Sequence, residues 1–119
     1  MRLADRIELW RLEGEWDKDS EMGMQHFRFP VEFHTITPHH ITGEYGRNST
    51  TNRGKITGGS FDENTMVLTF NYVQTFDGKK GTARLVLYQT ENEHKLHGTW
   101  THDGGESGGL KMRSLYKRN

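Results

Sequence analysis

The stretch Leu12-Glu13-Gly14-Glu15-Trp16-Asp17 sets an apolar or small residue at every second position, with an acid after each one. Successive side chains of a β-strand point to opposite faces, so a strand here puts Leu12, Gly14 and Trp16 on one face and the acids in water. The stretch therefore predicts the first strand of a sheet that has one covered face.

Residues 1–11, which precede this strand, have a different spacing. Leu3, Ile7 and Trp10 lie at i, i+4 and i+7 with charged residues between them, which is typical of one or two helical turns. A helix this short is not stable alone, so we expect it to pack against one end of the following domain. The predicted organisation is a short N-terminal helix over residues 1–11 and a single β-barrel domain over residues 12–119.

The alternating pattern continues to the end of the chain. It is cleanest over residues 25–36, where Phe27, Phe29, Val31 and Phe33 share one face. Further alternating runs cover residues 41–45, 55–61, 66–76, 82–88, 96–101 and 110–116. Regular spacing and short turns favour an up-and-down meander over a Greek key. The predicted fold is all-β, an eight-stranded antiparallel up-and-down β-barrel with a short N-terminal helix.

Three local features predict irregularities in this sheet. Pro30 has no N–H for a ladder, so its strand needs an edge, a bulge or a locally unpaired site there. The pair Gly58-Gly59 indicates a bulge or bend in the strand over residues 55–61. The polar, glycine-bounded residues 46–54 are the best candidate for a mobile loop over a cavity.

Composition excludes several classes of protein. The 119 residues suffice for one domain, and 31% hydrophobic residues with 14 glycines argue against a helical bundle. Lys plus Arg and Asp plus Glu number 16 each, so no overall field attracts extended nucleic acid or an anionic membrane. The absence of cysteine excludes disulfides, a thiolate nucleophile and cysteine-ligated metals.

The sequence has no apolar run of the roughly 18 residues needed to cross a bilayer, and no signal-peptide core follows Met1. We therefore expect no membrane segment in this chain and a cytoplasmic location. Whether the chain is one domain of a longer protein stays open.

An opening helix, Gly14-x-Trp16 in the first strand, a series of strands and a basic residue in the last strand together resemble the calycin superfamily, which includes lipocalins, fatty-acid-binding proteins and avidins. In those families the first-strand Trp closes the barrel base and an Arg of the final strand packs across it. The resemblance implies these structural roles for Gly14, Trp16 and Arg113, with Arg118 as the alternative arginine. The runs Ile41-Thr42-Gly43-Glu44-Tyr45 and Gly98-Thr99-Trp100 are similar to avidins, which pair into larger assemblies, so a homo-oligomer stays open.

A barrel of this size is just wide enough to be filled by side chains or to hold one small ligand, and both outcomes stay open. Polar or aromatic residues at strand positions can line such a pocket on an otherwise apolar wall. The candidate ligand-binding residues are Tyr45, Asn71, Tyr72, Arg84, Tyr88 and Trp100. Arg84 lies between Ala83 and Leu85, so an outward position is favoured; an inward guanidinium would need a carboxylate or phosphate as partner.

Metal and catalytic chemistry find little support in the sequence. His34, His39 and His40 surround one turn, but adjacent residues of a strand face opposite ways, so we predict no metal and no cofactor. His97 with Asp103 and His102 with Glu106 form His–acid pairs on paper, yet no nucleophile lies in a recognisable motif, so we predict no catalytic residues.

The function that these patterns favour is a non-enzymatic, small-ligand-binding β-barrel of calycin type, with its ligand at the open end near residues 46–54. The alternative is a nucleotide-sensing or interaction domain of a larger membrane-anchored or effector protein. The expected partner is thus a small molecule, and whether it is a nucleotide stays open.

Overall fold

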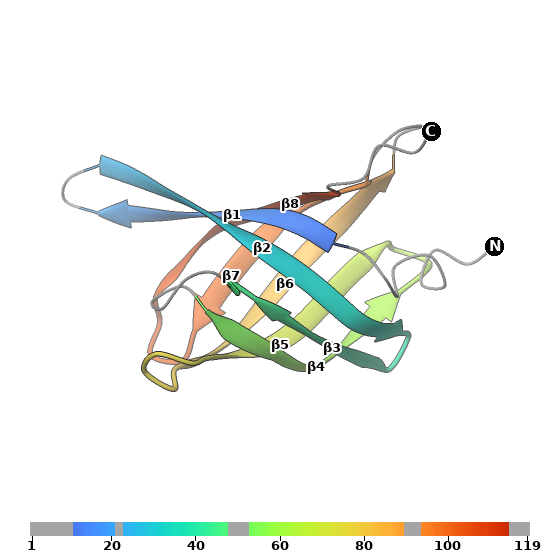
Figure 1. Ribbon diagram of the computed structural model, residues 1–119. Helices are drawn as coiled ribbons and strands as arrows, with labels where there is room; N and C mark the ends of the chain where they lie inside the picture. Colours follow the sequence, from blue (N-terminus) through green and yellow to red (C-terminus); the bar gives the residue numbers. More distant parts are fainter. Residues whose placement is uncertain (1–10, 21–22, 48–52, 90–93, 115–119) are drawn as a thin grey trace.

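The computed structural model describes the backbone of residues 11–20, 23–47, 53–89 and 94–114, and the side chains of residues 29–47, 53–88 and 95–113. The described backbone is a curled antiparallel sheet whose strands follow one another in chain order (Figure 1). Its strands are β1 (Arg11–Ser20), β2 (Gly23–Thr37), β3 (His40–Tyr45), β4 (Gly54–Asp62), β5 (Val67–Gln74), β6 (Lys80–Gln89), β7 (His94–His102) and β8 (Ser107–Ser114).

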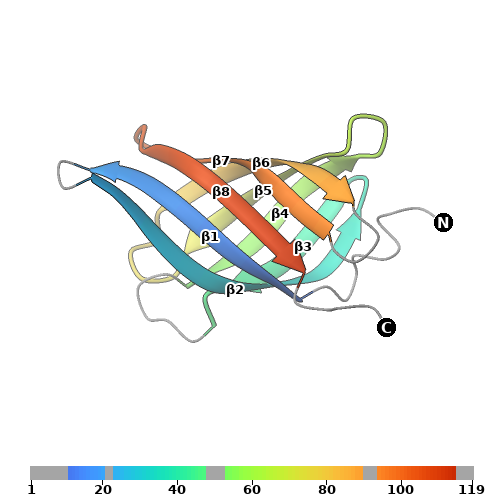
Figure 2. The same cartoon turned by 90° about the horizontal axis from the view of Figure 1, so that it is seen from above.

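Each strand pairs with the next in the chain, and β1 also pairs with β8, so that the sheet closes into a barrel (Figure 2). The predicted all-β class, antiparallel pairing and up-and-down order are confirmed. The part of the chain that the structure describes contains no helix. The helix predicted over residues 1–11 lies outside the described residues except for Arg11, which is the first residue of β1.

The alternation seen in the sequence decides which side chains face the barrel interior. In β2, Phe29, Val31 and Phe33 are buried, whereas His34 is exposed. Gly14 of β1 pairs directly with Phe29, and residues directly opposite each other in a sheet share a face. The backbone therefore places Gly14 on the inner face, as the pattern around it predicts.

The ladder between β2 and β3 ends beside Pro30. It stops with the pair Val31 and Tyr45, and the Gly46 N–H then donates a hydrogen bond of 2.8 Å to the Pro30 carbonyl. Proline has no N–H to offer the next rung, so the predicted locally unpaired site lies where the ladder stops.

Two bulges change the side-chain parity within a strand. One lies between Phe33 and Thr35 of β2, and the other lies between Ile56 and Gly58 of β4, at the glycine pair that predicted it. Because a bulge inserts one extra residue, Ile36 returns to the interior although it is three positions after Phe33.

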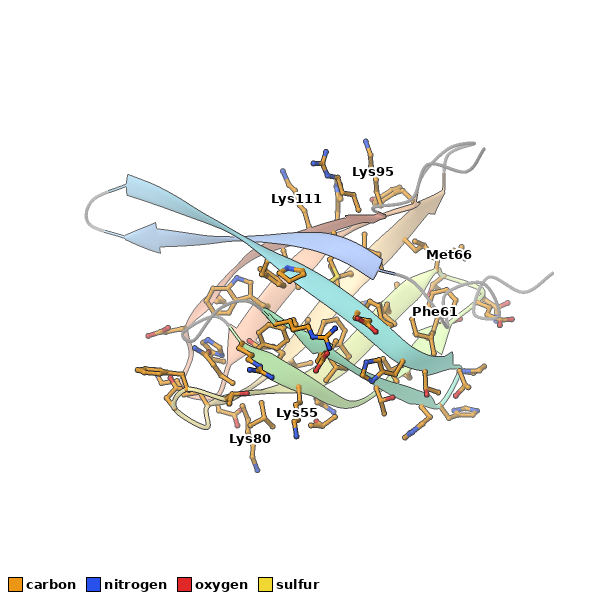
Figure 3. All side chains as sticks on the ribbon, viewed as in Figure 1. Lys55, Phe61, Met66, Lys80, Lys95 and Lys111 are labelled. Atoms are coloured by element: carbon orange, nitrogen blue, oxygen red, sulfur yellow. The ribbon has the colours of Figure 1, made fainter. Side chains whose placement is uncertain are left out.

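One end of the barrel is filled with side chains. Apolar residues that flank the turns β2–β3, β4–β5 and β6–β7 pack together there: Phe33, Ile36, Ile41, Phe61, Leu68, Leu85, Leu87 and Leu96. Figure 3 shows Phe61 and Met66 at this packed end, while Lys55, Lys80, Lys95 and Lys111 point away from the barrel. A ligand therefore has room only toward the opposite end.

Candidate ligand-binding site

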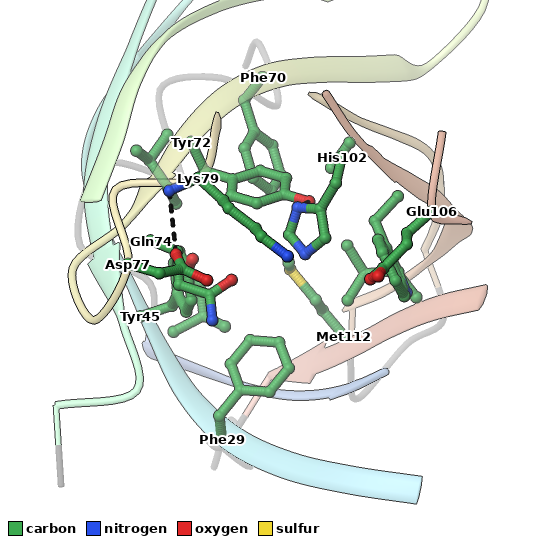
Figure 4. A pocket seen from close by; sticks show the side chains of 15 residues that line it. Phe29, Tyr45, Phe70, Tyr72, Gln74, Asp77, Lys79, His102, Glu106 and Met112 are labelled. Atoms are coloured by element: carbon green, nitrogen blue, oxygen red, sulfur yellow. Dashed lines mark hydrogen bonds between the residues drawn. The ribbon is translucent and has the colours of Figure 1, made fainter. Parts of the chain in front are cut away.

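A cavity of about 220 Å³ lies at the end of the barrel opposite the packed end. It is found where β3 stops, where β4 starts, and where β5 connects to β6 and β7 to β8 (Figure 4). Its walls are formed by Phe29, Val31, Tyr45, Ile56, Phe70, Tyr72, Gln74, Asp77, Lys79, Ala83, Trp100, His102, Glu106, Leu110 and Met112. An apolar cavity of about 150 Å³ already holds a benzene molecule, so this one has room for a ring-sized group. The sequence left a filled and an open interior as alternatives; the structure fills one end with side chains and has a cavity at the other.

A series of aromatic rings forms part of the cavity wall. Neighbouring ring centroids along the series Phe29, Tyr45, Tyr72, His102 and Trp100 lie 5.7, 5.9, 5.6 and 4.8 Å apart. The planes of neighbouring rings differ by 64°, 87°, 62° and 58°. Because the rings stand at steep angles to one another, they surround a volume instead of forming a flat stack.

Two of these rings lie against glycines of the neighbouring strand. Tyr45 pairs with Gly54 across β3 and β4, and Tyr72 pairs with Gly81 across β5 and β6. A Cβ added at either glycine would overlap the phenol of its tyrosine partner. The absence of a side chain at these positions therefore lets both rings lie close to the barrel wall, which leaves the centre of the cavity open.

A hydrogen bond of 3.0 Å joins the Tyr72 hydroxyl to Nδ1 of His102. Burial raises the pKa of Tyr72, and the nearby Tyr45 and the Asp103 carboxylate raise it further, so the hydroxyl stays protonated at neutral pH. When that hydroxyl donates to Nδ1, the neutral imidazole carries its own proton on Nε2. Figure 4 shows this second nitrogen on the side of the ring away from Tyr72, facing the pocket.

Polar groups gather at the mouth of the cavity, on the connection between β5 and β6 and on the β7–β8 turn. A carboxylate oxygen of Asp77 accepts a 2.9 Å hydrogen bond from the Lys79 backbone N–H, and Gln74 N–H donates to the Lys79 carbonyl at 2.7 Å. Gly78, with φ of 72°, supplies the left-handed residue that this turn needs. These bonds order the connection, while the Lys79 side chain extends over the pocket in Figure 4.

The negative charge at the mouth also reaches the second tyrosine. Burial raises the pKa of Tyr45 well above its usual value, and the nearby Asp77 carboxylate raises it further. Both phenols of the cavity are therefore neutral hydrogen-bonding groups at physiological pH.

Three of the six predicted ligand-binding residues line this cavity: Tyr45, Tyr72 and Trp100. The structure places the other three on the outer surface of the barrel. Asn71 there accepts a 3.1 Å hydrogen bond from the Thr82 hydroxyl, and Tyr88 is 52% exposed beside His97, with ring centroids 5.5 Å apart. Arg84 is exposed between the buried Ala83 and Leu85, the outward position that the sequence favoured. Strand alternation is the reason, because neighbours of an inward residue must point outward.

The structural roles that the calycin resemblance implies for the arginine and the tryptophan have different outcomes. Arg113 is exposed on the outer face of β8, next to the buried Met112, so it does not pack across the barrel interior. The backbone of Trp16 pairs with Phe27 and with Leu110, and Leu110 lines the cavity. The side chain of Trp16 and the whole of Arg118 lie outside the described parts of the structure.

Sequence analysis missed several residues of the site. His102 is the one that the sequence pattern could have predicted, because it continues the inward series Leu96, Gly98, Trp100 at every second position. Glu106, which the sequence analysis considered with His102 only as a His–acid pair, also lines the cavity. By contrast, Asp77 and Lys79 lie in a turn, where alternation gives no orientation.

Within the described residues, no group of three or more His, Asp or Glu side chains is arranged to hold a metal ion. His34, His39 and His40 are exposed. The described part of the chain has no helix that is long and apolar enough to span a membrane.

Comparison with known proteins adds no relative: no family model, no curated protein and no solved structure matches this chain.

The buried phenols predict a loss of stability in alkali. In the unfolded chain tyrosine ionises near its usual pKa of 10, whereas the folded state holds Tyr45 and Tyr72 protonated to higher pH. Their contribution to stability is fully present below pH 10 and is lost as the pH rises through the raised folded pKa values. Urea unfolding between pH 7 and pH 11 should show this decline, and Tyr45→Phe with Tyr72→Phe should make it shallower. Tyr88→Phe, which removes an exposed phenol, is the matched control; an equal change in that variant would contradict the assignment.

Proposed function

We propose that the protein is a non-enzymatic, small-ligand-binding barrel of calycin type, whose ligand occupies the cavity lined by Tyr45, Tyr72 and Trp100. The observation that carries this proposal is a concave cavity whose lining is mainly apolar and aromatic and includes a few polar groups. Sites for small molecules commonly have this composition, with an apolar wall for affinity and a few polar groups for orientation.

The dimensions of the cavity limit what the ligand can be. A volume of about 220 Å³ accommodates one ring or a short branched chain, and a larger ligand must extend past the mouth toward Gln74 and Glu106. The Tyr72 and His102 pair offers hydrogen bonds to a polar group near the mouth. The ligand is therefore expected to have an apolar part for the interior and a polar part for the rim.

Native mass spectrometry of the purified protein, followed by a fragment screen with thermal-shift readout, tests this proposal. Trp100→Ala and Tyr72→Ala remove cavity walls and should weaken any ligand by about tenfold or more, since each lost buried contact is worth about 1–3 kcal/mol. Tyr88→Ala removes an aromatic ring of the outer face and should leave binding unchanged. The proposal fails if no fragment binds, or if the outer-face variant weakens binding as much as the cavity variants do.

A nucleotide is the second candidate ligand. The observation in its favour is the series of rings, on which a nucleobase can stack, since aromatic platforms bind bases without needing a particular sequence. Only the base fits the cavity volume, so the phosphates would lie at the rim near Lys79. A thermal-shift series with cyclic nucleotides and dinucleotides separates the two candidates, because only a nucleotide site is stabilised selectively by this series.

A further inference from the structure

The walls of the cavity present aromatic groups in several directions. Phe29, Tyr45, Tyr72 and Trp100 come from four different strands, and neighbouring rings stand 58–87° apart, with His102 completing the series. The face of an aromatic ring carries partial negative charge and attracts cations, and enclosures of several rings bind quaternary ammonium groups. The ring geometry therefore suits a compact cation as well as a neutral hydrophobic group.

The charged side chains at the mouth of the cavity favour a cation over a neutral hydrophobic group. Among the ionisable Asp, Glu and Lys residues that line the cavity, Asp77 and Glu106 are acids and Lys79 is the base. Asp103, on the same turn as Glu106, adds a further carboxylate close enough to Tyr72 to affect its ionisation. Both phenols of the cavity are neutral, so the charged side chains of its lining are two carboxylates and one ammonium, and this excess of negative charge favours a cation over an anion at the entrance.

The Lys79 side chain places an ammonium group of the protein itself over the mouth of the cavity. Lys79 is an exposed residue of the β5–β6 connection, and Figure 4 shows its side chain extending over the pocket toward His102 and Met112. An exposed lysine chain is flexible and can swing away, so it can occupy the space over the rings when no ligand is bound and yield it to a ligand.

From these three observations we propose that the cavity selects an organic cation, with a methylated ammonium group enclosed by the rings and balanced by Asp77 and Glu106, and that Lys79 competes with it. This inference rests on the proposed function, because it names the ligand class of the same cavity.

Three probes of similar size and different charge test the inference on the full chain: choline, its uncharged isostere 3,3-dimethyl-1-butanol, and benzoate. Chemical-shift changes of the Gly54 and Gly81 amides, which lie beside the cavity tyrosines, report binding even when it is weak. We expect choline to bind about tenfold more tightly than the alcohol, since cation–π attraction adds about 1–2 kcal/mol at a desolvated site. Benzoate should bind weakest.

Charge variants of the mouth provide the second arm. Asp77→Asn with Glu106→Gln removes both charges, and the asparagine keeps an oxygen that can accept the Lys79 N–H, so the turn is retained. This double variant should lose about tenfold in choline affinity, while Lys79→Gln should gain about threefold, and neither should change the affinity for the alcohol. Tyr88→Ala is the matched control and should bind choline as the parent does.

The possible outcomes separate this inference from the proposed function. If the alcohol binds as well as choline, if benzoate binds best, or if Lys79→Gln weakens choline, the cation inference is overturned while a ligand-binding cavity survives. If none of the three probes shifts the cavity amides, and the fragment screen is also empty, the proposed function itself fails.

Discussion

Replacing Phe33 with alanine is expected to lower the free energy of unfolding by about 3–5 kcal/mol, the range for removing a buried phenyl ring from a well-packed core. Phe33 is 1% exposed in the packed end of the barrel, and its ring meets that of Phe70 edge to face at 5.9 Å. Phe33 does not itself line the cavity, so the substitution leaves a void in the packed end. Urea denaturation monitored by circular dichroism measures the effect.

Phe76 offers the matched control for this variant. It is the same residue type but is 67% exposed, so Phe76→Ala should change stability by no more than about 0.5 kcal/mol. Similar losses for the two variants would show that the packed end does not hold the barrel together.

Gly98→Ala is expected to destabilise the fold by about 3 kcal/mol, because the added methyl group would overlap backbone atoms of β6, the strand that pairs with β7. A Cβ at Gly98 would overlap the carbonyl oxygen of Arg84 and would lie 2.7 Å from the Cα of Leu85. Neither atom belongs to a flexible side chain, so β6 and β7 must separate locally. Hydrogen exchange should therefore show faster exchange of the amides between these strands, in addition to the lower midpoint in urea.

Gly58→Ala is the control for steric crowding, since a Cβ there meets nothing within 4 Å. It should leave stability within about 0.5 kcal/mol of the parent. If Gly58→Ala costs as much as Gly98→Ala, the overlap with β6 is not the cause of the loss.

Alternation alone predicted much of the sheet. The inward positions of Phe29, Val31 and Phe33 follow from one clean run, in which every second residue is apolar and the residues between them are mostly polar. The glycine pair at Gly58 correctly predicted a bulge. These features are local, so the chemistry of a few consecutive residues determines them.

Face assignment was harder where both faces of a strand carry apolar residues. β5 alternates Leu68, Phe70 and Tyr72 with residues that include Val67 and Val73, so its pattern does not say which set is inside. Asn71 and Tyr72 are adjacent, hence only one of them can face the cavity, and burial of the aromatic ring decided the matter.

The site itself depends on contacts between distant parts of the chain. That Tyr45 lies on Gly54 and Tyr72 on Gly81 is a consequence of strand register, which neither residue type reveals. The approach of Asp77 and Glu106 depends on two turns meeting at one end of the barrel. Such long-range placement is set by the closed sheet and not by local pattern.

The hairpin of β1 and β2 is longer than the barrel it belongs to. The pairs from Asp17 with His26 to Ser20 with Gly23 lie beyond the last pair that β1 makes with β8, and Figure 2 shows this ribbon projecting past the rim. In the described backbone it is thus a two-stranded segment without a third strand beside it. Two isolated strands are marginal in water, so this tip can fray and reform while the rest of the molecule stays folded.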